Sequence, residues 1–393
     1  MNAHPLRVVV LGSRFGGLAV LVWLRRRLGS GVAVTVVEQF AEMVFRPGLV
    51  VAGAGDADAV ARWRFPLAAV WRRLGVAGIH DTAVAIDPER RRVELASHPP
   101  LTYDVLFLAT GVDAAWEHIS GLGPDRGGVC EMPLAYRSAW RLRAWSGGTL
   151  VFAAGPLVTD DAGTPRAGCE CPLVETALLC DAAFRRRGVR RRTRMVVVTA
   201  ARALGEEGGP QGQAALLRRL RECAIEVVAG ARFLRVTGRR LELEGGVVLP
   251  TDAQIWTPPY AGSALARRSG LADGAGFVPV TEFGRHRRWE DVYAVGDVAA
   301  QPGPKSAHAA MVQARVAVGH LAARLGRGRL PDPYRPLTLW AMETGFGQGL
   351  WVVSDVFWGG RRQWVAEGRW PWLVKQGFNR AYRRWQGCLP VMP

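Results

Sequence analysis

Residues 6–17 read Leu-Arg-Val-Val-Val-Leu-Gly-Ser-Arg-Phe-Gly-Gly, and this stretch decides the fold. Its apolar first half predicts a buried strand over 6–12 that ends at a glycine. An amphipathic helix is predicted over 18–28, followed by a second strand over 32–37 and then by Glu38. Such a unit is typical of dinucleotide binding, because the helix N-terminus faces the pyrophosphate and the carboxylate binds ribose hydroxyls.

One position departs from the usual glycine pattern. Arg14 stands where the second glycine of Gly12-Ser-Arg-Phe-Gly-Gly17 would let the backbone approach the phosphates. The arginine side chain must therefore point away from the nucleotide or contact it. A short glycine pattern is weak by itself, so other segments must support the prediction.

Three distant segments each predict a short buried strand that ends in a turn. They are 101–111, which ends in Ala-Thr-Gly, 252–260, which is closed by two prolines, and 291–297, which ends in Gly-Asp before a helix over about 306–325. The middle of the chain has predicted strands at 149–154, 194–199 and 225–229 and a helix near 172–187. We therefore expect an α/β protein in which a second α/β domain is inserted into the first.

The composition supports a globular α/β protein with two or three domains, since 49% of the 393 residues are hydrophobic and 47 are glycine. The net charge of +17 comes mainly from arginine, because only Lys305 and Lys375 of the 51 basic residues are lysines. The arginine runs are scattered and no nucleic-acid-binding motif accompanies them, so we expect solvated faces and no nucleic-acid partner. A basic surface still favours an anionic membrane or an anionic small substrate.

Cysteine and hydropathy patterns narrow the class of protein further. The six cysteines form no C-x-x-C pair and histidine is sparse, so we expect neither a disulfide scaffold nor a metal site. No stretch approaches 18 consecutive apolar residues, and a strand begins almost at Met1, so we expect no spanning helix and no signal peptide. The expected location is the cytoplasmic side of the cell membrane, as a peripheral protein.

The second predicted domain lacks a glycine-rich nucleotide loop. After the strand at 149–154 the chain reads Gly155-Pro156 and then, past a short linker, Gly168-Cys-Glu-Cys-Pro-Leu-Val-Glu175. A cysteine pair at the start of a predicted helix takes the place of G-x-G-x-x-G. This pattern favours one nucleotide site with a thiol beside it, and electrons that do not come from NADH.

Together these segments resemble the FAD-dependent pyridine nucleotide-disulfide oxidoreductases, and in detail the sulfide:quinone oxidoreductases and the flavin subunit of flavocytochrome c sulfide dehydrogenase. The detailed resemblance rests on Val44-Phe-Arg-Pro-Gly-Leu49, Trp256-Thr-Pro-Pro-Tyr260 and Pro304-Lys-Ser306. It implies two Rossmann-like dinucleotide-binding domains, with the FAD domain split by the second. The implied domains are an FAD-binding domain over 1–114 and 249–330, a second Rossmann-like domain over 115–248, and a C-terminal membrane-associating region over 331–393.

The resemblance also implies an FAD site in the split domain. The residues expected to bind FAD are Gly12, Arg14, Phe15, Gly16, Gly17, Glu38, Arg46, Pro47, Ala109, Thr110, Gly111, Gly296, Asp297 and Lys305. By this resemblance Asp297 would meet the ribityl chain. The Lys305 ammonium would stabilise the anionic reduced flavin near its N1–O2 edge.

The resemblance assigns the catalytic work to thiols. Cys169 matches the family's cysteine before a helix start, and the helix N-terminus is expected to lower its pKa so that a thiolate attacks sulfur or the flavin. Glu175 is a candidate proton shuttle, Cys130 matches a cysteine that assists in some branches of the family, and Cys171 completes the candidate set. Cys180 and Cys223 are expected on helices in the core.

The family's partner redox cysteine is missing from this chain. Trp340 of Trp340-Ala-Met-Glu-Thr-Gly-Phe-Gly347 stands where members of the family carry it. Cys130, Cys171 and Cys388 remain as alternative partners for Cys169, and a Cys169–Cys171 bridge would be strained.

The C-terminal stretch 357–393 mixes five Trp and seven basic residues with one acidic residue, which is typical of a segment at a membrane interface. We therefore predict oxidation of sulfide or a related sulfur donor through a cysteine–flavin adduct, with membrane quinone as the acceptor. The alternatives are an enzyme like the type II NADH:quinone oxidoreductases, or a flavin-binding paralogue without the full cysteine set that acts as a scaffold or sensor. The sequence is compatible with a homo-oligomer.

Overall fold

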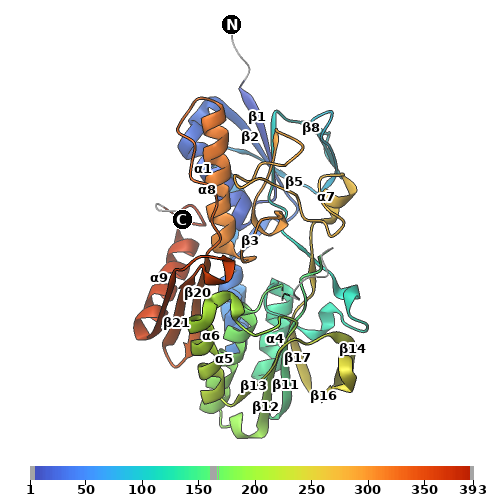
Figure 1. The fold of residues 1–393 in the computed structure, drawn as a ribbon, viewed down its shortest axis with the longest axis vertical. Helices are drawn as coiled ribbons and strands as arrows, with labels where there is room; N and C mark the ends of the chain where they lie inside the picture. Colours follow the sequence, from blue (N-terminus) through green and yellow to red (C-terminus); the bar gives the residue numbers. More distant parts are fainter. Residues whose placement is uncertain (1–4, 160–165, 167, 390–393) are drawn as a thin grey trace.

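The computed structural model describes residues 5–159, 166 and 168–389. Two parallel sheets form the centres of two lobes, which Figure 1 shows one above the other. The first lobe's sheet has the strand order β19-β9-β1-β2-β5, and the second lobe's sheet has the order β13-β12-β11-β17. A mixed α/β fold is therefore confirmed.

The first lobe is built on β1 (Leu6–Leu11), α1 (Phe15–Leu28) and β2 (Val32–Glu38), as the opening stretch predicts. β1 pairs in parallel with β2 on one side and with β9 (Val105–Leu108) on the other. The edge strands are β19 (Val292–Ala294) and β5 (Ala77–His80). The long helix α8 (Ala307–Arg324) packs along α1, and the two lie side by side in Figure 1.

The second lobe contains the predicted strands of the middle stretch, together with one more. Its sheet consists of β11 (Gly148–Ala154), β12 (Thr193–Thr199), β13 (Ile225–Val228) and β17 (Ala253–Thr257). Its helices are α4 (Met132–Arg143), α5 (Cys171–Arg186) and α6 (Gly209–Glu222). β17 pairs in parallel with β11, so the predicted domain boundary at 248 falls one strand too early. The order of motifs along the chain does not reveal which sheet a strand joins.

The C-terminal region folds onto the second lobe. Its antiparallel sheet consists of β20 (Thr338–Gly345), β21 (Gln348–Ser354) and β22 (Gln363–Gly368), and it is followed by α9 (Arg369–Arg384). β20 packs against α5, while β21 and β22 pack against α6. Among the residues that the structure describes, no helix is long and apolar enough to cross a membrane. The membrane-associating role of this region stays a prediction.

Smaller elements decorate the two lobes. Two three-stranded antiparallel sheets are formed by β6 (Ala83–Asp87), β7 (Arg92–Leu95) and β8 (Leu101–Thr102), and by β14 (Phe233–Thr237), β15 (Arg240–Leu243) and β16 (Val248–Pro250). Two strand pairs are β3 (Glu42–Val44) with β4 (Arg64–Pro66) and β10 (Asp113–Ala114) with β18 (Tyr260–Ala261). The short helices are α2 (Ala57–Ala61), α3 (Leu67–Leu74) and α7 (Ala264–Arg268).

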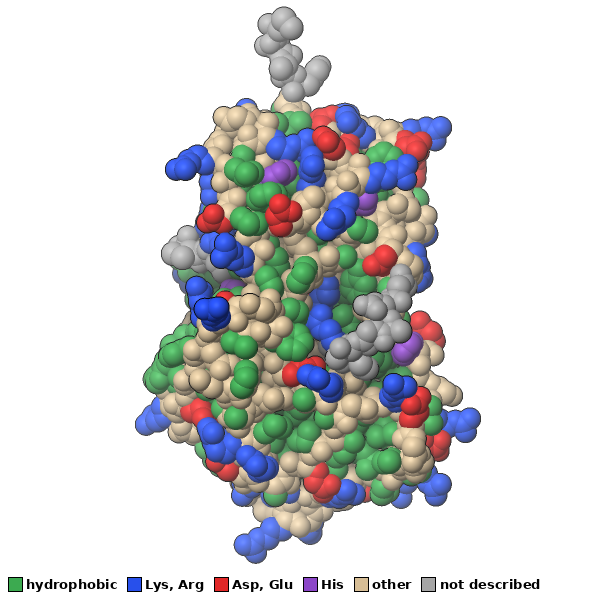
Figure 2. Space-filling view, viewed as in Figure 1, with side chains coloured by type: hydrophobic (Ala, Val, Ile, Leu, Met, Phe, Trp, Pro, Cys, Tyr) green, Lys and Arg blue, Asp and Glu red, His purple; other side chains and the backbone are tan. Residues whose placement is uncertain are grey.

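The arginine-rich charge is distributed over the surface. Figure 2 shows basic side chains spread over both lobes of one face, with acidic side chains between them. Several arginines are paired, such as Arg7 with Asp104 at 2.8 Å and Arg194 with Glu226 at 2.6 Å. Exposed pairs of this kind contribute about 0–1 kcal/mol each, so the arginine runs are a surface property rather than a fold determinant.

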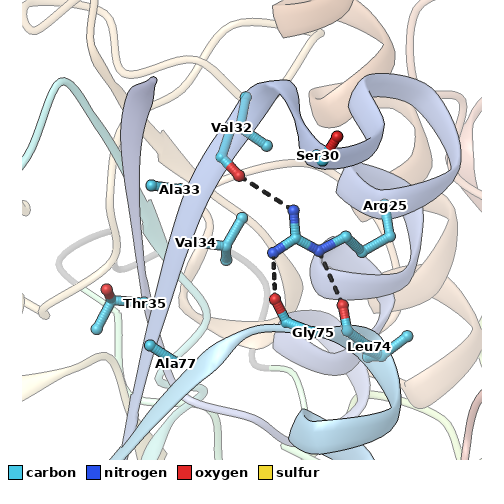
Figure 3. A pocket seen from close by; sticks show the side chains of 9 residues that line it. All are labelled: Arg25, Ser30, Val32, Ala33, Val34, Thr35, Leu74, Gly75 and Ala77. Atoms are coloured by element: carbon cyan, nitrogen blue, oxygen red, sulfur yellow. Dashed lines mark hydrogen bonds between the residues drawn. The ribbon is translucent and has the colours of Figure 1, made fainter. Parts of the chain in front are cut away.

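One surface pocket in the first lobe is lined by residues that hold neighbouring elements together. Figure 3 shows the Arg25 guanidinium donating to the backbone carbonyls of Val32 at 3.1 Å, Leu74 at 2.8 Å and Gly75 at 2.6 Å. Arg25 is the one charged side chain among the residues that line this pocket. Its hydrogen bonds tie α1 to the loops around β2 and β5, and the pocket carries no catalytic group.

Candidate functional site

The glycine turn after β1 admits no side chains at two positions. A Cβ atom on Gly17 would lie 1.9 Å from the Gly12 carbonyl oxygen. Gly12 has φ +94°, and a Cβ atom there would lie 2.5 Å from the Ala109 carbonyl oxygen. The turn therefore needs both glycines to bring the N-terminus of α1 against the strand ends, where its amide groups face an anion.

Glu38 closes this turn from the end of β2. Its carboxylate accepts hydrogen bonds from the Ser13 amide at 2.7 Å and from the Phe40 amide at 3.1 Å. A carboxylate has about four acceptor sites, so lone pairs remain for ribose hydroxyls. The turn and the carboxylate fit the nucleotide half of FAD.

Arg14 caps the N-terminus of α1 in an extended conformation. Its guanidinium lies 4.7 Å from the centre of the Phe40 ring and 3.6 Å from the Glu131 carboxylate. Glu131 also pairs with Arg46, so one carboxylate serves two guanidinium groups. Burial, and then the nearby Arg46, lower the pKa of Arg14. The surplus positive charge beside the helix N-terminus suits a diphosphate.

Other residues expected to contact the flavin gather at the junction of the two lobes. Lys305 donates to the Ala299 carbonyl oxygen at 2.8 Å, and its ammonium lies 4.7 Å from the centre of the Phe277 ring. Burial lowers the pKa of Lys305 to about 8, although the nearby Asp297 opposes that shift. Burial likewise raises the pKa of Asp297 against the attraction of Lys305 and Arg46. These groups form one electrostatic cluster that fits the polar edge of a flavin.

The remaining expected flavin-side residues lie around the same strand ends. Ala109, Thr110 and Gly111 follow β9, and Gly111 has φ +75° with open space where a Cβ atom would lie. Phe15 and Gly16 begin α1, Pro47 follows Arg46 in the 3-10 segment Arg46–Ala54, and Gly296 has φ +77° after β19. The structure therefore brings most of these residues to the carboxyl ends of the first lobe's parallel strands, whereas Pro47 follows the antiparallel strand β3. Their contacts with FAD remain predictions.

Cys130 and Cys169 lie side by side at the same junction. Their thiols are close enough to shift each other's pKa, and the Tyr260 hydroxyl lies near Cys130. The Cys169 carbonyl oxygen accepts a hydrogen bond from the Thr257 hydroxyl at 2.8 Å. Gly168, the residue before Cys169, packs so closely on the Tyr260 ring that a Cβ atom would lie 2.6 Å from it.

The predicted acidity of Cys169 is wrong. α5 begins at Cys171, so the helix N-terminus lies two residues beyond Cys169. The interaction with the Cys130 thiol, together with burial, raises the pKa of Cys169. The same interaction and the positive charge of Arg46 lower the pKa of Cys130 against the effect of its burial. Cys130 is therefore the more acidic thiol of the pair.

The other cysteines and Trp340 lie elsewhere. Cys171 begins α5 beside Glu170 and Glu175, and burial raises its pKa. Cys388 packs on the core of the first lobe near Tyr382. The Trp340 indole packs against Gly208, where a Cβ atom would lie 2.4 Å from the ring.

The two cysteines expected in the core are both buried. Cys180 lies within α5, as predicted. Cys223 directly follows the last residue of α6 rather than lying inside the helix.

Lys375 is a site residue that the sequence does not predict. It reaches from α9 to form a buried ion pair with Glu175 of α5, whose carboxylate also accepts the Glu343 amide at 2.8 Å. Burial raises the pKa of Glu175 to about 7, against the opposing charge of Lys375. A carboxyl group that titrates near neutrality one turn from Cys171 can hold or release a proton. The one sequence signal was that Lys375 is one of two lysines in the chain.

Glu170 occupies the place of a nucleotide cradle in the second lobe. Its carboxylate accepts hydrogen bonds from the Thr199 hydroxyl at 2.5 Å and from the Gly205 amide at 3.0 Å. Thr199 ends β12, the strand that corresponds to β2 in the first lobe. Burial raises the pKa of Glu170 to about 7. When ionised, this carboxylate repels phosphate at the N-terminus of α5.

The helix α9 connects the two lobes and has one apolar outer face. On its inner face the buried Tyr382 ring lies 4.8 Å from the Phe45 ring and 5.3 Å from the Phe15 ring, centre to centre. The outer face exposes large apolar side chains at 38–56% of their area, namely Trp370, Leu373, Val374, Phe378 and Trp385. In the described parts of the chain, no group of three or more His, Cys, Asp or Glu is placed to hold a metal ion.

Comparison with known proteins gives consistent matches over most of the chain. The sequence profile of the pyridine nucleotide-disulphide oxidoreductases matches residues 6–314. The mitochondrial sulfide:quinone oxidoreductase of Mus musculus is 24% identical over 363 residues, which cover 88% of this chain and 78% of the relative. The sulfide-quinone reductase of Aquifex aeolicus is 24% identical over an alignment of 402 residues, which covers 95% of this chain and 90% of the relative.

A solved structure shares the fold. The X-ray structure of the sulfide:quinone oxidoreductase from Aquifex aeolicus matches with a TM-score of 0.84 at 21% identity. The match covers 97% of this chain and 91% of that chain.

Proposed function

The chain belongs to the pyridine nucleotide-disulphide oxidoreductase family and is an FAD-dependent oxidoreductase, and from this premise we propose that it oxidises sulfide or a related sulfur donor. Cys169 receives the sulfur, and the electrons pass through FAD to a membrane quinone. The observation that carries the proposal is the position of Cys169. Its thiol lies beside that of Cys130 and close enough to the Asp297 carboxylate for the two charges to interact. The relatives named above act on sulfide and quinone, which supports the same substrate classes for this chain.

The chain's own residues supply binding, orientation and proton handling in this scheme. Bound FAD would supply a two-electron acceptor, to which a cysteine would add as the family resemblance implies. Lys305 and Asp297 would hold its polar edge, and Arg46 keeps positive charge beside the thiol pair. Glu175 near Cys171 would take up or release the protons that accompany sulfur chemistry.

The acceptor side of the proposal rests on α9. Its outward apolar residues are flanked by exposed Arg369, Arg380, Arg383 and Arg384, so that one helix presents an apolar face with basic borders. Such a face binds in the plane of an anionic bilayer. Quinone is dissolved in the bilayer, and the α9 residue Tyr382 already contacts Phe15 and Phe45 of the first lobe. The proposed location is therefore peripheral to the cytoplasmic side of the cell membrane.

NADH as the donor is disfavoured by a specific contact. Glu170 fills the position beside the N-terminus of α5 at which a second dinucleotide would place its phosphates. In the scaffold or sensor alternative, the protein binds FAD but catalyses no reaction. This alternative predicts FAD binding without reduction by sulfide, persulfides or NADH.

The test compares two single-cysteine variants of the purified flavoprotein. Cys169→Ser is expected to bind FAD but to lose anaerobic bleaching of the flavin by sulfide. Cys388→Ser, at a cysteine packed on the first-lobe core, is the matched control and is expected to bleach as the unmodified protein does. Unchanged bleaching in Cys169→Ser would remove Cys169 from the reaction.

A sedimentation assay tests the membrane side. Leu373→Asp is expected to reduce binding to vesicles that contain anionic lipid, because it places a charge in the apolar face of α9. Val227→Asp changes an exposed apolar residue on the distant strand β13 and serves as the control. Equal vesicle binding by the two variants would contradict a membrane role for α9.

A further inference from the structure

The end of β17 holds two cysteine-bearing segments together. The Trp256 amide donates to the Gly127 carbonyl oxygen at 3.2 Å, and Gly128 forms a parallel bridge with Trp256, so the segment leading to Cys130 runs along this strand. The next residue, Thr257, donates its hydroxyl to the Cys169 carbonyl oxygen at 2.8 Å. One strand end thus fixes the backbone on the approach to both cysteines.

The side chains around the pair complete the arrangement. Pro258 and Pro259 follow Thr257. Tyr260 then lies against both segments, with its ring on Gly168 and its hydroxyl near Cys130. Arg46 adds a positive charge beside Cys130. The Cys130 and Cys169 side chains meet within this frame and lie close enough to interact.

We propose that Cys130 and Cys169 form the redox disulfide of this chain, so that Cys130 acts as the partner that position 340 does not provide. The inference rests on the proposed function and names the second thiol of the same site. Other candidate partners fit the geometry less well. Cys171 starts α5 among carboxylates, and Cys388 packs on the first-lobe core.

The reaction steps balance with the donors already named. Hydrosulfide attacks the Cys169 sulfur of the disulfide, the S–S bond breaks, and Cys169 becomes a persulfide while Cys130 leaves as a thiolate. A low-pKa thiol leaves faster, and Arg46 and Tyr260 stabilise the Cys130 thiolate, so attack at Cys169 is the favoured direction.

The cycle closes in two further steps. An external thiolate or a second hydrosulfide takes the outer sulfur from the persulfide and leaves Cys169 as a thiolate. The two cysteine thiolates then form the S–S bond again and give two electrons to the bound flavin.

Disulfide mapping of the FAD-loaded wild-type protein tests the proposal without any variant. The oxidised protein is alkylated in denaturant without reductant, digested and analysed by mass spectrometry. A linked peptide pair containing Cys130 and Cys169 is expected, and it should disappear after anaerobic incubation with sulfide. A Cys169–Cys171 or Cys169–Cys388 link, or alkylated free thiols at 130 and 169, would overturn the proposal.

The rate of flavin reduction by sulfide, measured by stopped flow, is the second test of the Cys130–Cys169 pair. Cys130→Ser is expected to slow sulfide-dependent flavin reduction by about 100-fold or more while the FAD content is kept. Cys130→Ala replaces it if the serine variant does not retain FAD, and Cys388→Ser is the control. Reduction of the Cys130 variants at the wild-type rate would contradict the pair. Absence of sulfide bleaching in the wild type would instead defeat the proposed function, whatever the disulfide map shows.

Discussion

The two lobes use the same strand–helix–strand unit and finish it in opposite ways. In the first lobe, the carboxylate of Glu38 at the end of β2 accepts the Ser13 amide from the turn before α1. In the second lobe, the carboxylate belongs to Glu170 directly before α5 and accepts the hydroxyl of Thr199 at the end of β12. In the first lobe the carboxylate ends the second strand and its partner precedes the helix, whereas in the second lobe the carboxylate precedes the helix and its partner ends the second strand. One unit therefore leaves its helix N-terminus open to a phosphate, and the other fills it and presents thiols.

The exchange shows that a parallel strand pair does not by itself define a nucleotide site. A turn of only Gly12, Ser13 and Arg14 joins β1 to α1, whereas β11 ends at Ala154 and α5 begins at Cys171. The position of one acidic side chain then decides whether an anionic ligand is attracted or repelled. Four predictions test this difference, and among those on FAD binding and among those on stability the larger expected effect comes first.

The largest effect on FAD binding is expected from Gly17→Ala, which breaks the open cradle. Its Cβ atom would lie 1.9 Å from the Gly12 carbonyl oxygen, so the turn must shift. We expect FAD affinity to fall by about 100-fold or more, which corresponds to about 2.7 kcal/mol, in a fluorescence titration of the apoprotein. Gly377→Ala is the matched control, because its Cβ atom meets nothing within 4 Å. Normal FAD binding by Gly17→Ala would mean that the turn does not hold the nucleotide.

Lys375→Met tests how the second lobe stabilises the buried carboxylate of Glu175. Removing one partner of the ion pair leaves Glu175 buried without a counter-charge. We expect the free energy of unfolding to fall by about 3–5 kcal/mol in a urea titration. The double variant Lys375→Met with Glu175→Leu should regain most of this loss. Equal stability of the wild type and Lys375→Met would show that the contact is not formed in solution.

Glu170→Gln tests the buried carboxyl group of the second lobe through the pH dependence of the free energy of unfolding. Burial raises the pKa of Glu170 from 4.5 to about 7, so between these pH values the folded chain keeps a proton that the unfolded chain releases. The stability from this group is complete below pH 4.5 and is lost as the pH rises to about 7.

The amide of Glu170→Gln does not titrate. A difference of one in pKa corresponds to about 1.4 kcal/mol, so the rise from 4.5 to about 7 predicts that the variant gains on the order of 3 kcal/mol relative to the wild type between pH 4.5 and 7.5. Parallel pH–stability curves for the two proteins would contradict the buried carboxyl.

Arg14→Ala gives the smallest expected effect. The side chain sits at the N-cap of α1 where a glycine would be usual, and it adds positive charge beside the expected diphosphate. We expect the variant to bind FAD about tenfold more weakly, or about 1.4 kcal/mol. Tighter FAD binding by Arg14→Ala would mean that the arginine obstructs the cradle.

The sequence was sufficient for the first lobe because its signals are local. The glycines, the strand that ends at Glu38 and the helix after Ser306 all depend on neighbouring residues, and the structure has these elements where they were predicted. β17 was predicted as a strand but assigned to the other sheet, since pairing with β11 is a contact between residues 103 positions apart in the sequence.

The features missed at the site are all tertiary. The ion pair of Lys375 joins two helices that are 200 residues apart in the sequence. Cys169 was expected to be acidic because it precedes a helix, but its neighbour Cys130 and burial reverse the direction of the pKa shift. No role was predicted for Glu170, because its role depends on contacts with Thr199 and Gly205, which lie far from it in the sequence.

The most direct test of the central claim is an anaerobic reductive titration of the purified FAD-loaded protein with sulfide and, separately, with NADH. The open cradle of the first lobe and the filled cradle of the second predict that sulfide bleaches the flavin absorbance and that NADH leaves it unchanged. Bleaching by NADH, with no change on addition of sulfide, would contradict the claim.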